Sequence, residues 1–100
     1  MAALSDAEVS DRLETVGDWR REDSTIEREL ELANFAAAIA LVNRVAEVAE
    51  RANHHPDILV HGWNKLRLTL STHSAGGLTD ADFELAGRID ELVDGLIGRA

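Results

Sequence analysis

The stretch IERELELANFAAAIALVNRVAEVAERA, residues 26–52, contains two patterns of apolar residues with different periods. In residues 26–32 the side chains alternate between two faces, with Ile26, Arg28, Leu30 and Leu32 on one and Glu27, Glu29 and Glu31 on the other. From residue 35 onward, apolar side chains recur every three or four positions. The first period is typical of a half-buried antiparallel strand and the second of an amphipathic helix. The stretch therefore predicts a strand and then a helix, each with an apolar face to bury.

The sequence also marks both ends of this helix. Asn34 is a suitable N-cap, because its side chain can accept a hydrogen bond from the first helical turn. The apolar stripe that follows consists of Phe35, Ala38, Ile39, Val42, Val45, Ala46 and Ala49. Pro56 disfavours helical geometry at the residue before it, so the helix should end at about Arg51 or Ala52.

The segments before residue 26 predict a helix and a strand. Ser5 and Glu8 have the spacing of a capping box, which favours a short helix that ends at about Gly17. A polar turn at Asp23-Ser24 separates residues 19–23 from the strand at 26–32. The two segments on either side of this turn therefore predict a first hairpin.

The segments after residue 57 predict another hairpin and a last helix. Residues 58–63 and 66–72 read as two strands that turn around Asn64-Lys65. Thr79 and Asp82 offer a capping pair for a helix. The apolar positions of that helix are Phe83, Ala86, Ile89, Leu92, Val93 and Leu96.

Together these elements predict one α+β domain over residues 1–100, with the order α-β-β-α-β-β-α. Short hairpins favour antiparallel pairing, and an apolar sheet face must be covered. We therefore expect a four-stranded antiparallel sheet with three helices packed on one face. The order of the strands across the two hairpins does not follow from the sequence.

The composition excludes several classes of function. The chain has nineteen acidic and ten basic residues, which gives a formal charge of −9. This charge disfavours binding to nucleic acid or to an anionic membrane surface, since both need a basic face. The chain has no cysteine, so it has no disulfide framework and no thiolate metal site. The first residues do not resemble a signal peptide, so we expect a cytoplasmic protein.

The motif NHHPD, residues 53–57, supplies the main candidate site. His54 and His55 fall at the predicted end of a helix, and His73 falls at the end of the last strand. Three interpretations are open: a metal site, an acid/base site, or a polar helix end favoured by the helix dipole. Adjacent helical residues point about 100° apart, and the spacing lacks the i, i+4 pattern of helical metal sites. The sequence therefore predicts no metal ligands here, and its local chemistry leaves the other two interpretations open.

Other polar and aromatic residues have structural explanations as well as functional ones. Asp82 could belong to the site or could cap the last helix. Trp19 and Trp63 are large apolar surfaces that suit a core or an interface, and Trp63 could also line a cleft beside its hairpin turn. His61 alternates with Leu59 and Trp63 along a strand, and we do not expect it to be catalytic.

The run EVAERANHHPDILVHGWNKLRLTLSTHSAGGLTDADFELA, residues 47–86, resembles the pterin-4a-carbinolamine dehydratases. Three residues separate Glu50 from His54-His55-Pro56, six separate Pro56 from Trp63, and nine separate Trp63 from His73. Asp82 follows at the distance that this family shows, and Trp19 stands where the family has a tryptophan. The resemblance extends over about residues 4–97. The chain departs from the family pattern at Leu30, Leu32, Asn53 and Trp63.

The resemblance implies both a fold and an activity. The family fold is a four-stranded antiparallel sheet with helices on one side. The family reaction removes water from 4a-hydroxytetrahydrobiopterin to give the quinonoid dihydropterin, without a metal or an organic cofactor. The resemblance makes His54 and His73 the acid/base pair and gives His55 a role in binding and orienting the pterin. The residues expected to shape or support the pocket are Glu50, Pro56, Trp19, Asp82 and Trp63.

The resemblance also implies partners and leaves alternatives. Family members form dimers or tetramers, so we expect a homodimer or homotetramer whose small-molecule partner is a pterin. A non-catalytic pterin-binding or dimerising regulatory module with the same fold is one alternative. A metal-dependent hydrolase that uses the same histidines is another.

Overall fold

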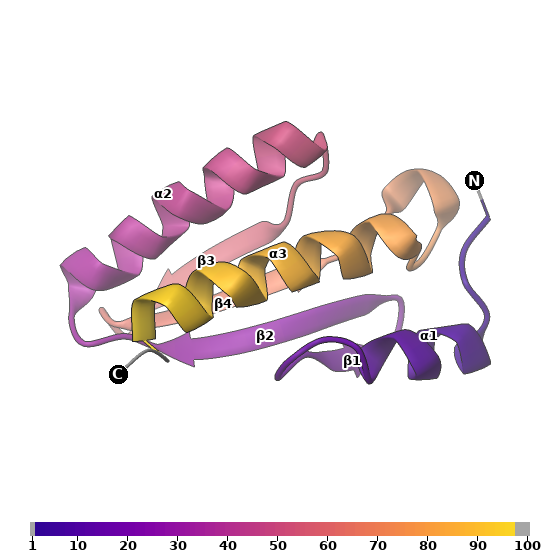
Figure 1. Cartoon of the computed structure of the whole chain (residues 1–100), viewed down its shortest axis with the longest axis horizontal. Coiled ribbons are helices and arrows are strands. Elements are labelled where there is room, and N and C mark those ends of the chain that lie inside the picture. The colour runs from indigo at the N-terminus through magenta and orange to yellow at the C-terminus, as the bar shows by residue number, and fades with distance from the viewer. Residues whose placement is uncertain (1, 98–100) are drawn as a thin grey trace.

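An antiparallel sheet of four strands forms one layer of the molecule, and its order is β1-β2-β4-β3. The computed structural model describes residues 2–97. Its strands are β1 (Arg20–Glu22), β2 (Thr25–Glu31), β3 (Asp57–His61) and β4 (Lys65–Leu70). Its helices are α1 (Asp6–Leu13), α2 (Phe35–Ala52), α3 (Asp80–Ile97) and the short 3₁₀ helix η1 (His73–Ala75). The predicted order α-β-β-α-β-β-α and the predicted α+β class are therefore confirmed (Figure 1).

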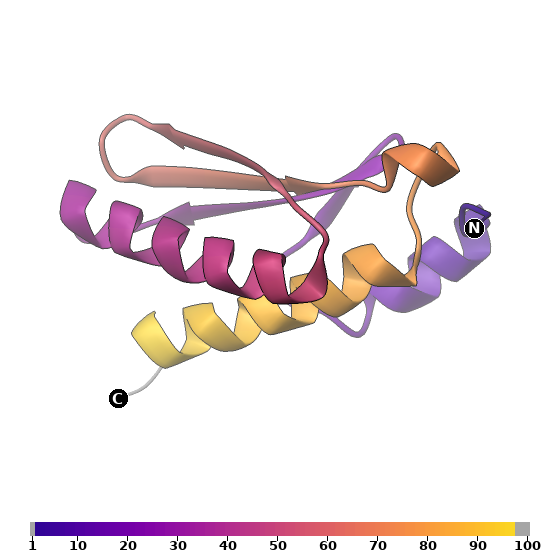
Figure 2. The same ribbon diagram turned by 90° about the horizontal axis from the view of Figure 1, so that it is seen from above.

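The three α-helices lie on one side of the sheet, as Figure 2 shows from above. The alternation of side chains divides the sheet into an apolar face and a polar face. The buried core between the sheet and the helices includes Val9, Ile26, Leu41, Val45, Leu66, Leu68, Leu70, Leu85, Ile89 and Val93. Within residues 2–97, no helix is long and apolar enough to cross a membrane.

The second helix begins and ends where the sequence predicts. The side chain of Asn34 accepts a hydrogen bond from the backbone N–H of Ala37, at 2.8 Å. At the other end Asn53 has a φ of 51°, in the left-handed region. Asparagine tolerates this region better than most residues, because its short side chain can bond locally. Asn53, one of the departures from the family pattern, therefore ends α2 and redirects the chain toward β3.

The turn of the second hairpin differs from the sequence-based prediction. Strand β3 ends at His61 and β4 begins at Lys65, so the turn is at residues 62–64 and not at Asn64-Lys65. Gly62 and Trp63 both have positive φ, 54° and 60°. Glycine adopts this conformation at little cost, so the turn begins at residue 62. Trp63 consequently stands in the turn and not in a strand.

Several other elements are also shorter than predicted. Strand β4 ends at Leu70, before Ser71 and Thr72, and β1 covers only Arg20–Glu22. Helix α1 ends at Leu13, four residues before Gly17. The backbone N–H of Gly17 donates to the carboxylate of Asp90 at 2.8 Å, so this segment is held by α3 and leaves the helix early.

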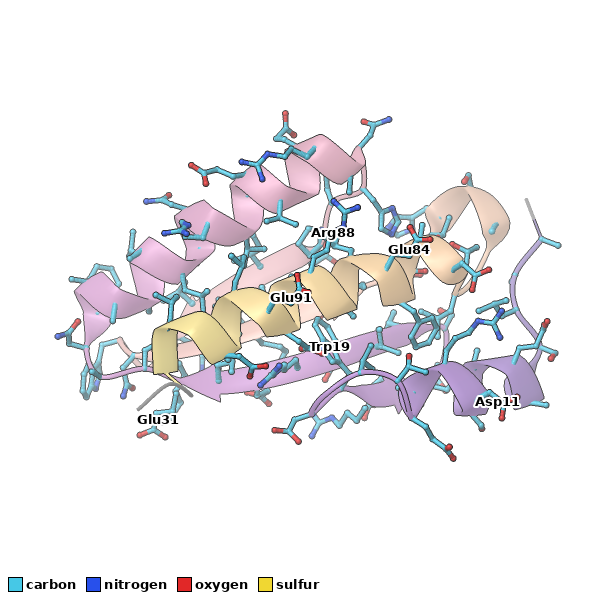
Figure 3. The ribbon with its side chains drawn as sticks, in the orientation of Figure 1. Asp11, Trp19, Glu31, Glu84, Arg88 and Glu91 are labelled. Atoms are coloured by element: carbon cyan, nitrogen blue, oxygen red, sulfur yellow. The ribbon has the colours of Figure 1, made fainter. Side chains whose placement is uncertain are left out.

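Asp90 lies at the centre of a polar cluster inside the apolar layer. Its carboxylate also accepts a hydrogen bond from the indole Nε1 of Trp19, at 2.8 Å, and pairs with the guanidinium of Arg28. The Arg28 side chain is only 9% exposed, so Asp90 supplies the counter-charge that a nearly buried cation needs. The cluster joins α3 to β2 and to the segment before β1, and Trp19 lies between α3 and β2 (Figure 3).

Replacing Asp90 with alanine should lower the free energy of unfolding by about 3 kcal/mol, because the nearly buried Arg28 keeps only a distant, exposed partner, Asp18 at 4.0 Å. For a domain of this size the melting temperature should fall by about 4–8 °C for each kcal/mol. Urea denaturation measures the free energy of unfolding and thermal denaturation measures the melting temperature, both followed by circular dichroism. Asp94→Ala is the matched control, since Asp94 is an exposed carboxylate on the same helix and should change stability by less than about 0.5 kcal/mol. Equal effects of the two substitutions would contradict the assignment.

Candidate active site

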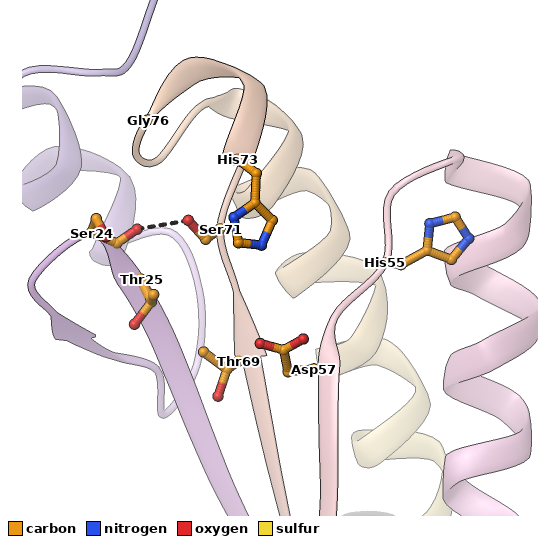
Figure 4. A pocket seen from close by; sticks show the side chains of 8 residues that line it. All are labelled: Ser24, Thr25, His55, Asp57, Thr69, Ser71, His73 and Gly76. Atoms are coloured by element: carbon orange, nitrogen blue, oxygen red, sulfur yellow. Dashed lines mark hydrogen bonds between the residues drawn. The ribbon is translucent and has the colours of Figure 1, made fainter.

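A polar pocket of about 210 Å³ opens at the end of the sheet where β2 and β3 begin and β4 ends. Its lining residues are Ser24, Thr25, His55, Asp57, Thr69, Ser71, His73 and Gly76 (Figure 4). Asp57 of β3 pairs with Thr69 of β4, and Ile26 of β2 pairs with Leu70. Since side chains alternate between faces, Thr25 and Thr69 share the face opposite the buried Ile26 and Leu70. The pocket therefore lies over the polar face of the sheet, away from the helices.

His73 reaches the pocket from the loop that follows β4. It is the first residue of η1, and its side chain is exposed. The loop is closed by a backbone hydrogen bond from Thr72 N–H to the carbonyl of Gly77, at 3.0 Å. Gly76 has a φ of 72° and allows the chain to reverse direction there. This closed loop fixes the backbone from which the His73 ring extends (Figure 4).

His54 is held by a buried carboxylate. Its Nε2 lies 2.5 Å from Oδ1 of Asp82, whose side chain is fully buried, and the His54 side chain is 16% exposed. Asp82 also accepts hydrogen bonds from the hydroxyl of Thr72, at 2.8 Å, and from the backbone N–H of Thr79, at 2.9 Å. An ionised carboxylate can only accept hydrogen bonds, so Nε2 of His54 carries the hydrogen and donates it. In the neutral ring, Nδ1 is then the nitrogen with a free lone pair. Asp82 therefore both caps α3 and fixes the tautomer of His54.

His55 has a different environment, although it adjoins His54. Its Nε2 lies 2.6 Å from a carboxylate oxygen of Glu50, and both side chains are mostly exposed, at 55% and 76%. Figure 4 shows the ring turned toward α2, while its residue still contributes to the pocket wall. An exposed pair of this kind adds little to stability. Of the two adjacent histidines, His54 is therefore anchored by a buried partner and His55 lies at the surface.

The structure gathers some of the expected site residues and separates others. His54, His55, His73, Glu50 and Asp82 lie at the pocket end of the sheet, and Pro56 stands between His55 and the start of β3. His54 itself does not line the pocket. Trp19 is buried beside Asp90. Trp63 is 63% exposed in the β3–β4 turn, at the other end of those strands. Neither tryptophan reaches this pocket.

The pocket also contains residues that the sequence did not indicate. Asp57, Thr25 and Thr69 come together only through the pairing of three strands. The alternation of polar side chains in 66–72 gave a partial signal for Thr69, but the register of the β3–β4 hairpin was needed to place it beside Asp57. Among residues 2–97, no three His, Cys, Asp or Glu side chains are arranged to hold a metal ion.

Comparison with known proteins gives consistent matches. Residues 2–92 match the family model described as pterin 4 alpha carbinolamine dehydratase. Two curated relatives bear the provisional name pterin-4-alpha-carbinolamine dehydratase. The protein of Nocardia farcinica is 54% identical over 89 residues, which are 89% of this chain and 93% of the relative. The protein of Chloroflexus aurantiacus is 52% identical over 93 residues, which are 93% and 99% of the two chains.

Two solved structures have the same fold. A transcriptional coactivator/pterin dehydratase from Brucella melitensis superposes with a TM-score of 0.84 at 27% identity, covering 90% of this chain and 97% of that one. A pterin dehydratase-like protein, identified as a RuBisCO assembly factor in the alpha-carboxysome, superposes with a TM-score of 0.62. The second match is 23% identical and covers 76% and 89% of the two chains, so it supports the fold alone.

Replacing Asp82 with alanine should release the ring of His54 and remove the cap of α3. We expect the free energy of unfolding to fall by about 3 kcal/mol, because several buried donors lose their acceptor. In ¹⁵N NMR spectra of the neutral ring, wild-type His54 should be the Nε2–H tautomer, and the variant should populate both tautomers. Asp80→Ala is the control, because Asp80 is a mostly exposed carboxylate in the same helical turn. A single unchanged His54 tautomer in the Asp82 variant would contradict the assignment.

Proposed function

Because the chain belongs to the pterin-4-alpha-carbinolamine dehydratase family, and a dehydratase is a hydro-lyase, we propose that it dehydrates 4a-hydroxytetrahydrobiopterin. The product is the quinonoid dihydropterin, and the activity supports recycling of tetrahydrobiopterin. The observation that supports the proposal is a polar pocket of about 210 Å³ with His55 and His73 in its wall. His54, which precedes His55 in the chain, is held in place by Asp82. The proposed reaction uses no metal and no organic cofactor.

The chemistry needs one acid and one base on the same substrate. The C4a–O bond breaks and the hydroxyl group leaves as water, so an imidazolium must donate a proton to it. The N5–H bond also breaks, its electron pair forms the C4a=N5 bond, and a neutral imidazole takes the proton. Histidine serves both purposes near neutral pH, and each positioned group contributes about 10²–10⁴-fold.

We assign the acid/base pair to His54 and His73. The hydrogen bond to Asp82 supports the assignment of His54, since a catalytic imidazole works best when a carboxylate fixes its tautomer and orientation. The position of His73 in the pocket wall supports its assignment. Glu50 holds His55 at the surface, which suits a residue that binds and orients the pterin.

His73→Ala and His54→Ala should each lower kcat by about 10²-fold or more, because each removes one proton-transfer group. The assay follows the absorbance of synthetic 4a-hydroxytetrahydropterin with and without protein, with the spontaneous rate subtracted. His61→Ala is the control, since His61 lies at the far end of β3 and should leave turnover unchanged. Circular dichroism verifies that each variant is folded. Wild-type turnover in folded variants of both residues would disprove the assignment.

His55→Ala should act mainly on KM. The ring contributes to binding, and an interaction made equally with substrate and transition state raises KM when removed and leaves kcat nearly unchanged. We expect KM to rise by about 10-fold, the effect of losing one good hydrogen bond. Steady-state kinetics over a range of substrate concentrations separates the two constants. A loss confined to kcat would instead make His55 part of the proton-transfer pair.

A non-catalytic pterin-binding or dimerising regulatory module is the second candidate. The Brucella melitensis structure carries both descriptions in its name, coactivator and dehydratase, on the same fold. A folded wild-type protein that binds a reduced pterin and gives no dehydration above the spontaneous rate would favour the module. We expect a homodimer or homotetramer in either case, and sedimentation equilibrium measures it.

A further inference from the structure

One carboxylate in the pocket has no role in the assignments above. Asp57 is the first residue of β3 and the only acidic residue among the eight that line the pocket. It follows Pro56 and pairs in register with Thr69 of β4. A side chain on a paired strand is held more firmly than one on a loop. Figure 4 shows the carboxyl group between the strands, on the same side as Thr69 and below the His73 ring.

Asp57 also has no partner in the protein, whereas several polar side chains around it do. Asp82 and Glu50 are each paired with a histidine. The hydroxyls of Ser71 and Thr25 donate to backbone carbonyls, of Ser24 at 3.0 Å and of Glu22 at 2.9 Å. Within residues 2–97, the Asp57 carboxylate makes no hydrogen bond or ion pair of its own. It is therefore an acceptor available to a ligand, and its loss should not disturb the fold.

The substrate of the proposed reaction has an edge that needs such an acceptor. The pyrimidine ring of a pterin presents two adjacent donors, the N3–H and the 2-amino group. These lie on the side of the bicycle away from N5, where the proton-transfer groups act. A carboxylate can accept from both donors at once, and charged hydrogen bonds of this kind are the strong ones.

We propose that Asp57 binds the N3–H and 2-amino edge of the pterin and so selects a 2-amino-4-oxo ring. This inference rests on the proposed function, because it concerns the substrate of the same pocket. Asp57 then contacts the substrate at a distance from the reacting atoms, and it acts on binding and specificity. The histidines act on C4a and N5 while Asp57 sets the position of the ring.

The test compares two stable ligands that differ at one group. A 7,8-dihydropterin carries the 2-amino donor, and the matching dihydrolumazine has an oxo acceptor in its place. The wild-type protein should bind the pterin at least about 10-fold more tightly, since the oxo group would face the carboxylate without a hydrogen. Asp57→Asn offers one acceptor and one donor, which matches the lumazine edge. The variant should therefore lose or reverse the preference, as measured by titration calorimetry.

Kinetics complete the test. Asp57→Asn should raise KM for the 4a-hydroxypterin about 10-fold or more and change kcat only a few-fold, because Asp57 does not touch the reacting atoms. Asp94→Asn, on an exposed turn of α3, should leave both constants and the ligand preference unchanged. An unchanged preference for pterin over lumazine in a folded, active Asp57→Asn variant would overturn the inference and leave the proposed function standing. A wild-type protein that neither binds nor dehydrates the pterin would overturn both.

Discussion

The buried carboxylate of Asp82 joins the three segments on which the site depends. It accepts hydrogen bonds from His54 after α2, from Thr72 after β4, and from the backbone of Thr79 before α3. A carboxylate that is fully removed from water is costly unless its lone pairs are used, and here several donors use them. The same bonds bring the end of α2, which carries the adjacent histidines, close to the loop that carries His73. The position of the site is therefore a consequence of satisfying one buried charge.

One face of the sheet contributes to stability and the other to the pocket. Its apolar face packs against the helices and also holds Arg28, whose charge is balanced by Asp90. Its polar face carries Thr25, Asp57 and Thr69, which line the pocket. Because side chains alternate strictly between faces, one strand can contribute to the core and to the pocket without a conflict between the two. The strands that form the pocket floor are therefore the strands that carry the core.

The sequence predicted the fold well because periodicity is a local signal. The strand at 26–32, the cap at Asn34 and the capping box at Ser5 depend on neighbouring residues alone. The hydrogen bond from the Ser5 backbone N–H that completes this box also lowers the pKa of Glu8. The turn of the second hairpin was misplaced although its cause, Gly62 with a positive φ, is local. The end of α1 was misplaced because a distant residue decides it. Helix α1 ends early because Gly17 binds Asp90, and the local sequence gives no sign of this long-range contact.

The site was only partly predictable for the same reason. The motif at 53–57 and the distant His73 could be found from spacing, but the role of Asp57 depends on the register in which β3 pairs with β4, and the sequence misplaced the turn that sets it. Three carboxylates near the histidines have different surroundings: Asp82 is buried and accepts several hydrogen bonds, Glu50 is exposed and paired with His55, and Asp57 lines the pocket without a partner of its own. Composition counts them as equal parts of an acidic surface. Their burial and their partners give them different roles. Asp82 builds the site, Glu50 holds a histidine, and Asp57 remains available for a ligand.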